Sequence, residues 1–81
     1  MTKPHHPKLP LCCALAAHNE RYQFAHTLSA VIAAASYDER KAELHRLSGL
    51  LAAYLEFDLI TREQHSALRT ELREFVFGAS A

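Results

Sequence analysis

Apolar side chains in the second half of the chain recur at spacings of three and four residues, which is the period of an α-helix. Between residues 37 and 57 they form one broad apolar face, made by Leu44, Leu47, Leu50, Leu51, Tyr54 and Leu55. A face of this width is typical of a helix that packs on two neighbours rather than one. We therefore predict a central helix over residues 37–57.

A second periodic segment follows after a short joint. Its core stripe consists of His65, Leu68, Leu72, Phe75 and Val76. Gly78 comes directly after the stripe and is a typical helix stop signal. The pattern predicts a helix over residues 62–77, which would form an αα-hairpin with the central helix.

Two capping boxes mark where these helices begin. Ser36 and Glu39 match the S-x-x-E pattern, in which each residue satisfies a free backbone N–H group at a helix start. Thr61 and Gln64 match the equivalent T-x-x-Q pattern. The caps predict helix starts close to residues 37 and 62.

The joint between the two helices is mostly apolar. We expect Phe57, Leu59 and Ile60 to fill the turn with their side chains. Ile60 precedes the capping Thr61 and can fold back on the new helix as a hydrophobic staple. Asp58 is expected to stay in water.

The N-terminal part also has a helical pattern, starting at Pro10, whose missing N–H group costs nothing in a first turn. The segment runs to Ala35 without a breaker, and its later apolar face consists of Phe24, Leu28, Val31, Ile32 and Ala35. Two alternatives stay open. One is a continuous helix over residues 10–35, and the other is a break near His18 and Asn19, with Asn19 capping a shorter second helix.

These elements predict an all-α fold, a small three-helix bundle built on the C-terminal αα-hairpin, with the first helix either continuous or broken. Residues 1–8, MTKPHHPK, are predicted to be a flexible basic tail, because Pro4 and Pro7 oppose regular structure. Residues 9–78 are then a single helical domain, and residues 79–81 a disordered C-terminus.

The predicted hairpin, LHRLSGLLAAYLEFDLITREQHSALRTEL, resembles the short helical hairpins of the SHOCT type, in which a Leu-Ile-Thr turn follows a Leu-rich helix. Those hairpins usually have Gly before Leu-Ile-Thr, where this chain has Asp58. They also have an aromatic residue at about the place of His65. The resemblance implies a shared way of making the turn and assigns no family.

Composition supports helices over a sheet. The chain has only two Gly and three Pro, and all three Pro lie within the first ten residues. The formal net charge is zero, so the domain lacks the electrostatic footprint of a general nucleic-acid binder. Residues 36–60 are acidic, because five acids against three bases give a net charge of −2.

The two cysteines, Cys12 and Cys13, are adjacent, which makes a disulfide between them strained and rare. Free thiols fit a reducing compartment, so we expect a cytoplasmic protein. The apolar run from Leu11 to Ala17 is too short for a cleaved signal peptide or for the roughly 20 residues of a membrane span. Near a helix start, these thiols are expected to have a lowered pKa and to be reactive rather than catalytic.

Six histidines raise metal binding as a hypothesis, but the spacing of a structural zinc site is absent from the sequence. His5 and His6 lie in the predicted tail, and His18 and His26 would share a helix stripe with Tyr22. Convergence of this stripe with the histidines of the other helices would give a titrating cluster. The simpler expectation is that each ring nitrogen reaches water, with no metal and no cofactor.

Catalysis has few candidates in this chain. They are Cys12 or Cys13 with His18, and the carboxylates of Glu56 and Asp58. The sequence contains no phosphate-binding glycine loop, oxyanion motif or paired-acid motif. We therefore expect that the protein is not an enzyme.

The third predicted helix has a basic edge and an acidic edge. Arg62, Arg69 and Arg73 fall within about 40° of one another at 100° per residue, while Glu63, Glu71 and Glu74 gather on the far side. One interpretation is an ordinary solvated face with weak ion pairs. The other is a contact site for an acidic protein surface or a phosphate backbone, since the forked Arg side chain suits both.

From these features we expect a small non-catalytic protein that binds another protein as an adaptor, inhibitor or regulator. The predicted contact residues are Arg62, Arg69 and Arg73, with Tyr22, Tyr37 and Phe77 as aromatic anchors. An apolar content of 49% is much for so short a chain, so a homodimer or a covering partner is also expected. Short alanine-rich chains of this kind are frequent among bacterial accessory proteins.

The alternative is a small dimeric regulator that binds nucleic acid with its third helix. Arg62, Gln64 and Ser66 lie near the start of that helix, where they could reach base edges. The neutral net charge and the acidic residues 36–60 oppose this hypothesis. Two copies presenting two such helices and two basic tails would weaken that objection.

Overall fold

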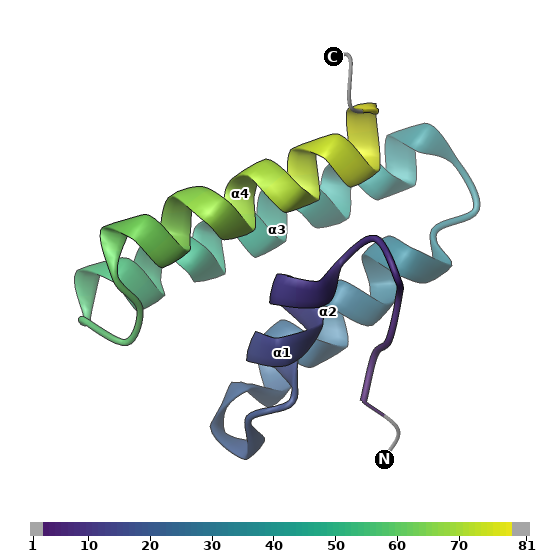
Figure 1. Ribbon diagram of the computed structural model, residues 1–81. Coiled ribbons are helices and arrows are strands. Elements are labelled where there is room, and N and C mark those ends of the chain that lie inside the picture. Colours follow the sequence, from purple (N-terminus) through teal and green to yellow (C-terminus); the bar gives the residue numbers. More distant parts are fainter. Residues whose placement is uncertain (1–2, 79–81) are drawn as a thin grey trace.

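The computed structural model describes residues 3–78, which contain four α-helices and one short 3₁₀-helix (Figure 1). The elements are α1 (Pro10–Ala16), η1 (Asn19–Arg21), α2 (Tyr22–Ala33), α3 (Tyr37–Glu56) and α4 (Arg62–Phe77). Within residues 3–78 there is no β-strand, so the predicted all-α class is confirmed. None of these helices is long and apolar enough to cross a membrane.

The first predicted helix is broken, as the second of the two alternatives had it. α1 ends at Ala16, and His18 has an extended backbone with ψ of 130°. Asn19 does not cap the following α-helix, because it begins η1, and Arg21 takes the position before α2. The bundle therefore has four α-helices, with α1 and α2 in place of one long helix.

α2 also ends earlier than predicted, at Ala33 instead of Ala35. The backbone of Ala34 is extended, and the N–H group of Ala35 donates to the Glu39 carboxylate of the next helix at 3.1 Å. Ser36 then accepts from the N–H group of Glu39 at 3.1 Å. Ala35 thus belongs to the cap of α3, and it is exposed instead of lying on the apolar face of α2.

The Thr61 and Gln64 capping box forms completely at the start of α4. The Thr61 hydroxyl accepts from the Gln64 N–H group at 3.0 Å, and the Gln64 side-chain carbonyl accepts from the Thr61 N–H group at 2.8 Å. Both predicted helix starts, at residues 37 and 62, are confirmed.

Fewer apolar side chains are buried in the turn between α3 and α4 than predicted. Ile60 is buried, but Phe57 is 75% exposed and Leu59 is 48% exposed, so the expectation that all three fill the turn is wrong. The turn closes through backbone hydrogen bonds, including that from the Leu59 N–H group to the Tyr54 carbonyl oxygen at 2.8 Å. Asp58 is exposed, as predicted, and has a positive φ of 59°.

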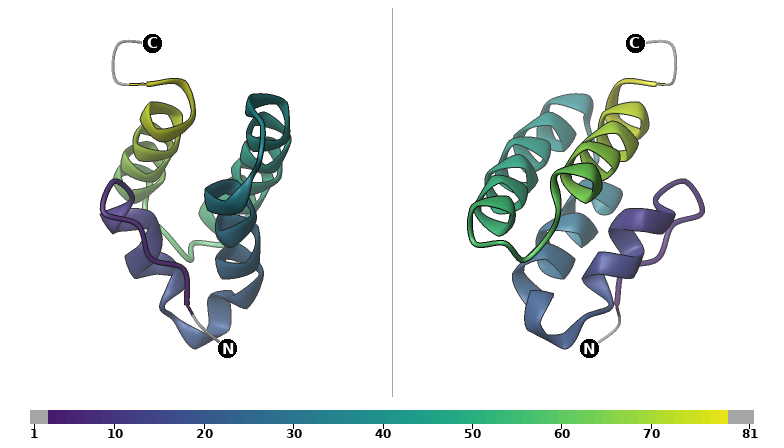
Figure 2. Two further views of the ribbon diagram at one scale, coloured as in Figure 1. Left: turned by 90° about the vertical axis from the view of Figure 1, so that its right-hand side faces the viewer. Right: turned by 60° about the vertical axis from the view of Figure 1, so that its left-hand side comes forward.

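The four helices are arranged as a ring around the core. α3 packs on α2 and α4, and α1 also packs on α2 and α4. Figure 2 shows the result as two pairs, with α4 above α1 on one side and α3 above α2 on the other. The largest fully buried side chains come from all four helices and the segment before α1, and are Leu9, Cys12, Phe24, Leu28, Val31, Leu47, Leu51 and Leu72.

Aromatic contacts fix the broken segment and the N-terminal segment on this ring. The Arg21 guanidinium lies 5.2 Å from the centre of the Tyr54 ring on α3. His6 meets the Phe75 ring of α4 edge-on, with 4.8 Å between ring centres. The predicted tail therefore has a defined contact at His6, while residues 1–2 and the predicted disordered residues 79–81 lie outside the described residues.

Candidate functional site

A groove with basic walls runs between α3 and α4 and has a volume of about 330 Å³. Lys41 and His45 line it from α3, and Arg69 and Arg73 line it from α4. Leu44 and Leu72 are buried among its lining residues, and Ser48 and Phe77 complete the lining. We call it the basic groove.

The basic groove faces away from the rest of the bundle. On α3, Tyr54 marks the side toward α2, since its ring packs against Phe24 with 6.2 Å between ring centres. His45 lies nine residues before Tyr54, which places it about 180° around the helix at 100° per residue. The groove is therefore on the outer face of the α3–α4 hairpin, and α1 and α2 do not cover it.

Two aromatic side chains meet beside the groove where α3 begins and α4 ends. The rings of Tyr37 and Phe77 pack edge-on with 5.9 Å between their centres. They remain 52% and 39% exposed, respectively. The Lys41 ammonium lies 5.1 Å from the centre of the Tyr37 ring, a cation–π contact that leaves its charge unneutralised.

The cationic side chains of the groove have no acidic partner within residues 3–78. The ion pairs recorded in that part of the chain join Arg21 to Glu20 and Arg46 to Glu43, at 3.8 and 3.4 Å. Neither involves a side chain of the groove. The groove thus has an uncompensated positive charge in a protein whose formal net charge is zero.

The acidic edge of α4 makes contacts that differ from those of the basic edge. The Glu71 carboxylate accepts hydrogen bonds from the backbone N–H groups of Leu11 and Cys12 in the first turn of α1, at 3.0 and 2.8 Å. The edge that carries Glu71 therefore faces α1. The basic edge, with Arg69 and Arg73, is left on the outer face.

Four of the six predicted contact residues come together at the basic groove. They are Arg69, Arg73 and Phe77 in its lining, and Tyr37 in contact with Phe77. The other two lie elsewhere, because Arg62 begins α4 about two turns before Arg69, and Tyr22 begins α2, at the end of the molecule far from the end of α4 (Figure 1).

Sequence reasoning did not single out Lys41 and His45 as members of the site. A signal for them was present, because Tyr37, Lys41 and His45 follow one another at intervals of four residues and so share one side of a helix. What the sequence could not show is that this side of α3 lies against the Arg69 and Arg73 side of α4.

The environment of the Cys12 thiol disfavours its deprotonation. Burial raises the pKa of Cys12 above its usual range, and the nearby Glu71 carboxylate raises this pKa further. The thiol also lies 3.9 Å from the Leu68 carbonyl oxygen, to which it can donate. The expectation of a lowered pKa at a helix start is wrong for Cys12, because burial and the capping carboxylate outweigh the helix dipole.

The histidines are dispersed over the fold. His18 lies in the break before η1, so the predicted stripe of His18, Tyr22 and His26 is interrupted and does not follow one helix. His45 is at the basic groove and His65 is half-buried on α4. Among residues 3–78, no three His, Cys, Asp or Glu side chains lie close enough to hold a metal ion.

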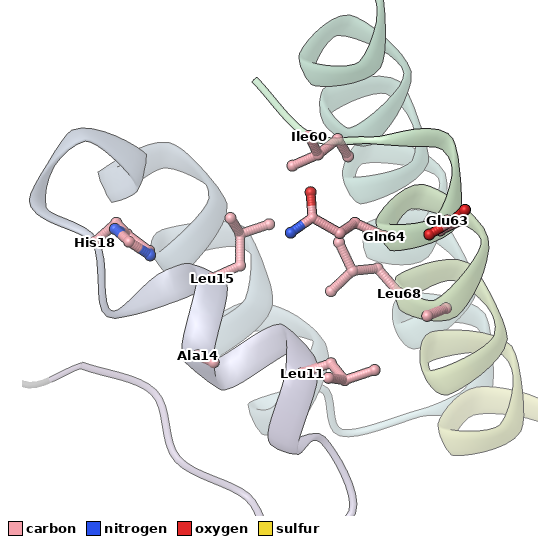
Figure 3. Close-up of a pocket in the computed structure, with 9 residues that line it drawn as sticks. Leu11, Ala14, Leu15, His18, Ile60, Glu63, Gln64 and Leu68 are labelled. Atoms are coloured by element: carbon pink, nitrogen blue, oxygen red, sulfur yellow. The ribbon is translucent and has the colours of Figure 1, made fainter. Parts of the chain in front are cut away.

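A second hollow, of about 390 Å³, lies between α1 and the start of α4 (Figure 3). Its walls are mainly apolar, with Leu11, Leu15 and Leu68 among the lining residues. Figure 3 shows Gln64 reaching from α4 toward Leu15. The side-chain oxygen of Gln64 is already engaged in the capping box, so its amide nitrogen remains as the donor of this side chain. This hollow lacks the charge pattern of the basic groove.

Comparisons with known proteins gave no significant match to a family model, to a curated protein or to a solved structure. The likeness of the α3–α4 hairpin to SHOCT-type hairpins therefore assigns no family.

Proposed function

We propose that this chain is a small cytoplasmic, non-catalytic protein that binds another protein through the basic groove, acting as an adaptor, inhibitor or regulator. The observation that carries the proposal is the groove itself, where Lys41, Arg69 and Arg73 meet one histidine and two exposed aromatic rings, with no ion pair to an acidic side chain of residues 3–78. Arg and aromatic residues are enriched at the energetically dominant positions of protein interfaces.

The state of Cys12 supports a non-catalytic role. A cysteine nucleophile needs an accessible thiolate, whereas Cys12 is fully buried and its pKa is raised by burial and by Glu71. The carboxylates named as catalytic candidates, Glu56 and Asp58, are exposed at the α3–α4 turn, outside both hollows. A positioned acid–base pair in a cleft, as general catalysis requires, is not formed by these residues.

The test is affinity capture of the tagged protein from a lysate of its own organism, with and without nuclease. Wild-type protein should retain one stoichiometric protein that survives nuclease treatment. The double variant Arg69→Glu, Arg73→Glu should lose that partner, because two attractive charges become repulsive ones. Capture of the partner by this variant at wild-type levels would overturn the proposal.

A matched control is available in Arg46 and Arg62. The variant Arg46→Glu, Arg62→Glu makes the same change of net charge on exposed α3 and α4 positions outside the groove. It should keep the partner. Both double variants should show the far-UV circular dichroism of the wild type, because all four side chains are exposed.

Nucleic-acid binding is the second candidate, since Lys and Arg side chains without acidic partners also suit backbone phosphates. The groove favours it less than a short peptide, because Asp38 follows Tyr37 directly in the first turn of α3 and is exposed. A long polyanion that runs past Tyr37 would meet this carboxylate. Retained nucleic acid, or partners lost on nuclease treatment, would move this candidate to first place.

A further inference from the structure

We infer that the occupant of the basic groove is a short acidic segment of the partner, with acidic side chains at alternate positions and an aromatic or aliphatic side chain two positions further on. This inference rests on the proposed function and names the chemistry of the ligand. It follows from the order and spacing of the side chains along the groove.

Both walls of the groove carry the same order of side chains. On α3, Tyr37 is followed at intervals of four residues by Lys41 and His45. On α4, Phe77 is preceded at intervals of four residues by Arg73 and Arg69. Because the two helices form an antiparallel hairpin and Tyr37 contacts Phe77, both rows run from an aromatic residue to two basic side chains in the same direction.

The spacing of these rows sets the spacing of the ligand. Residues four apart on a helix are separated by about 6 Å along its axis. An extended peptide rises about 3.3 Å per residue, so every second side chain, on the same face, is about 6.6 Å from the previous one. Alternate side chains of an extended peptide therefore match the rows, in the pattern acidic, any, acidic, any, apolar, in either chain direction.

The chemistry at each end of the groove fits this pattern. Arg69 and Arg73 present guanidinium forks, which pair with carboxylates in a bidentate manner. At the other end the half-exposed rings of Tyr37 and Phe77 offer apolar surface. Asp38 follows Tyr37 in the first turn of α3 and is exposed, which disfavours an acidic residue at this end and favours an apolar one.

The probe for this inference is a library of random peptides displayed on phage and selected on the full-length protein. Wild-type protein should enrich peptides in which acidic residues alternate with other residues and end at an aromatic or aliphatic residue. The Arg69→Glu, Arg73→Glu protein should instead enrich basic peptides, because its α4 row now carries two carboxylates. Enrichment of peptides without acidic residues on the wild-type protein would overturn the inference.

A selected peptide, made synthetically, then allows each end of the groove to be tested by fluorescence anisotropy. Arg69→Glu with Arg73→Glu should weaken its binding by at least about tenfold, and Phe77→Ala should weaken it by about tenfold. The control variant Arg46→Glu with Arg62→Glu should change the dissociation constant of the peptide by no more than about twofold. Replacement of an apolar Phe of the peptide by Leu should likewise change it by no more than about twofold. Equal losses in the groove variant and in the control variant would overturn the inference.

Failure of the inference can be told from failure of the proposed function. If acidic peptides do not bind, but lysate capture still yields a partner that the Arg69→Glu, Arg73→Glu variant loses, the ligand chemistry is wrong and the proposed function stands. If a single-stranded DNA oligonucleotide displaces the peptide from wild-type protein at a lower concentration than unlabelled peptide does, the groove is a nucleic-acid site and both are overturned.

Discussion

The Glu71 carboxylate on α4 accepts a hydrogen bond from the backbone N–H group of Cys12 on α1, at 2.8 Å, although the two residues are 59 positions apart. Its other oxygen accepts from the N–H group of Leu11 at 3.0 Å. α1 has no side-chain cap of its own at Leu9. A residue from the far end of the chain thus satisfies the free N–H groups of the first turn and ties α1 to α4.

Replacement of Glu71 by Ala should release this tie. Two hydrogen bonds to a charged acceptor are lost, so the free energy of unfolding should fall by about 1 to 3 kcal/mol. Hydrogen exchange should speed up first at the amides of Leu11 and Cys12, which would lose their acceptor. Chemical denaturation and exchange monitored by NMR measure the two effects.

Glu74 is the matched control for this prediction. It lies about one turn further along α4, is exposed, and its carboxylate accepts no hydrogen bond among the described residues. Glu74→Ala should change stability by no more than about 0.5 kcal/mol. Equal stability losses in Glu71→Ala and Glu74→Ala would show that the cap contributes nothing.

Asp58 adopts a left-handed backbone conformation with φ of 59°, at the position where SHOCT-type hairpins usually have Gly. Gly reaches this region without steric cost, and Asp tolerates it better than most residues. Asp58→Gly should therefore leave stability unchanged or raise it by up to about 1 kcal/mol, whereas Asp58→Val should lower it by about 1 to 2 kcal/mol. Urea denaturation measures the stability of both variants. Equal midpoints for Asp58→Gly and Asp58→Val would contradict the left-handed backbone conformation of residue 58.

The buried thiol of Cys12 should make the fold sensitive to alkali. Its pKa is raised in the folded protein, so its contribution to stability is complete below the ordinary thiol pKa of about 8.5 and is lost as the pH rises toward the folded value. The loss should be about 1.4 kcal/mol per pH unit above pH 9. Burial also raises the pKa of Tyr54, which should add a loss of the same sign above about pH 10.

Denaturation curves between pH 7 and 10 measure this slope. Cys12→Ala should be less stable at neutral pH, because a fully buried side chain is truncated, but should show a flatter decline between pH 8.5 and 10. Cys13→Ala retains the Cys12 thiol and should keep the steeper decline. The same slope in wild type and Cys12→Ala would rule out Cys12 as its origin.

The substitution of Leu by Ala can be compared at a buried position, Leu51, and at a partly exposed position, Leu59. Leu51 on α3 is fully buried, so Leu51→Ala should cost about 2 to 5 kcal/mol and could unfold so small a protein. Leu59 in the α3–α4 turn is 48% exposed, so Leu59→Ala should cost less than about 1 kcal/mol. Similar melting temperatures for the two variants would show that the core face of α3 is misassigned.

The α3–α4 hairpin is largely determined by local sequence. Its helix starts follow from capping contacts over three residues, at Ser36 and Thr61, and its buried positions follow from apolar periodicity. Contacts over three residues depend only on the local backbone, so they can be predicted without the rest of the fold. The break in the first helix was only one of two alternatives, and the local signal expected for it, a cap by Asn19 on the second helix, is not the one the fold uses, because Arg21 takes the position before α2.

The features on which the proposed function depends were decided by tertiary structure. The basic groove exists because one edge of α4 faces α3 and solvent while the opposite edge, through Glu71, caps α1. The pKa of Cys12, the exposure of Phe57 and the pairing of Tyr37 with Phe77 likewise depend on which helix packs beside which. By itself, the sequence determined the helices and the character of each edge. Only packing between residues far apart in the chain decided which edges meet, because a helix pattern carries no information on its neighbour.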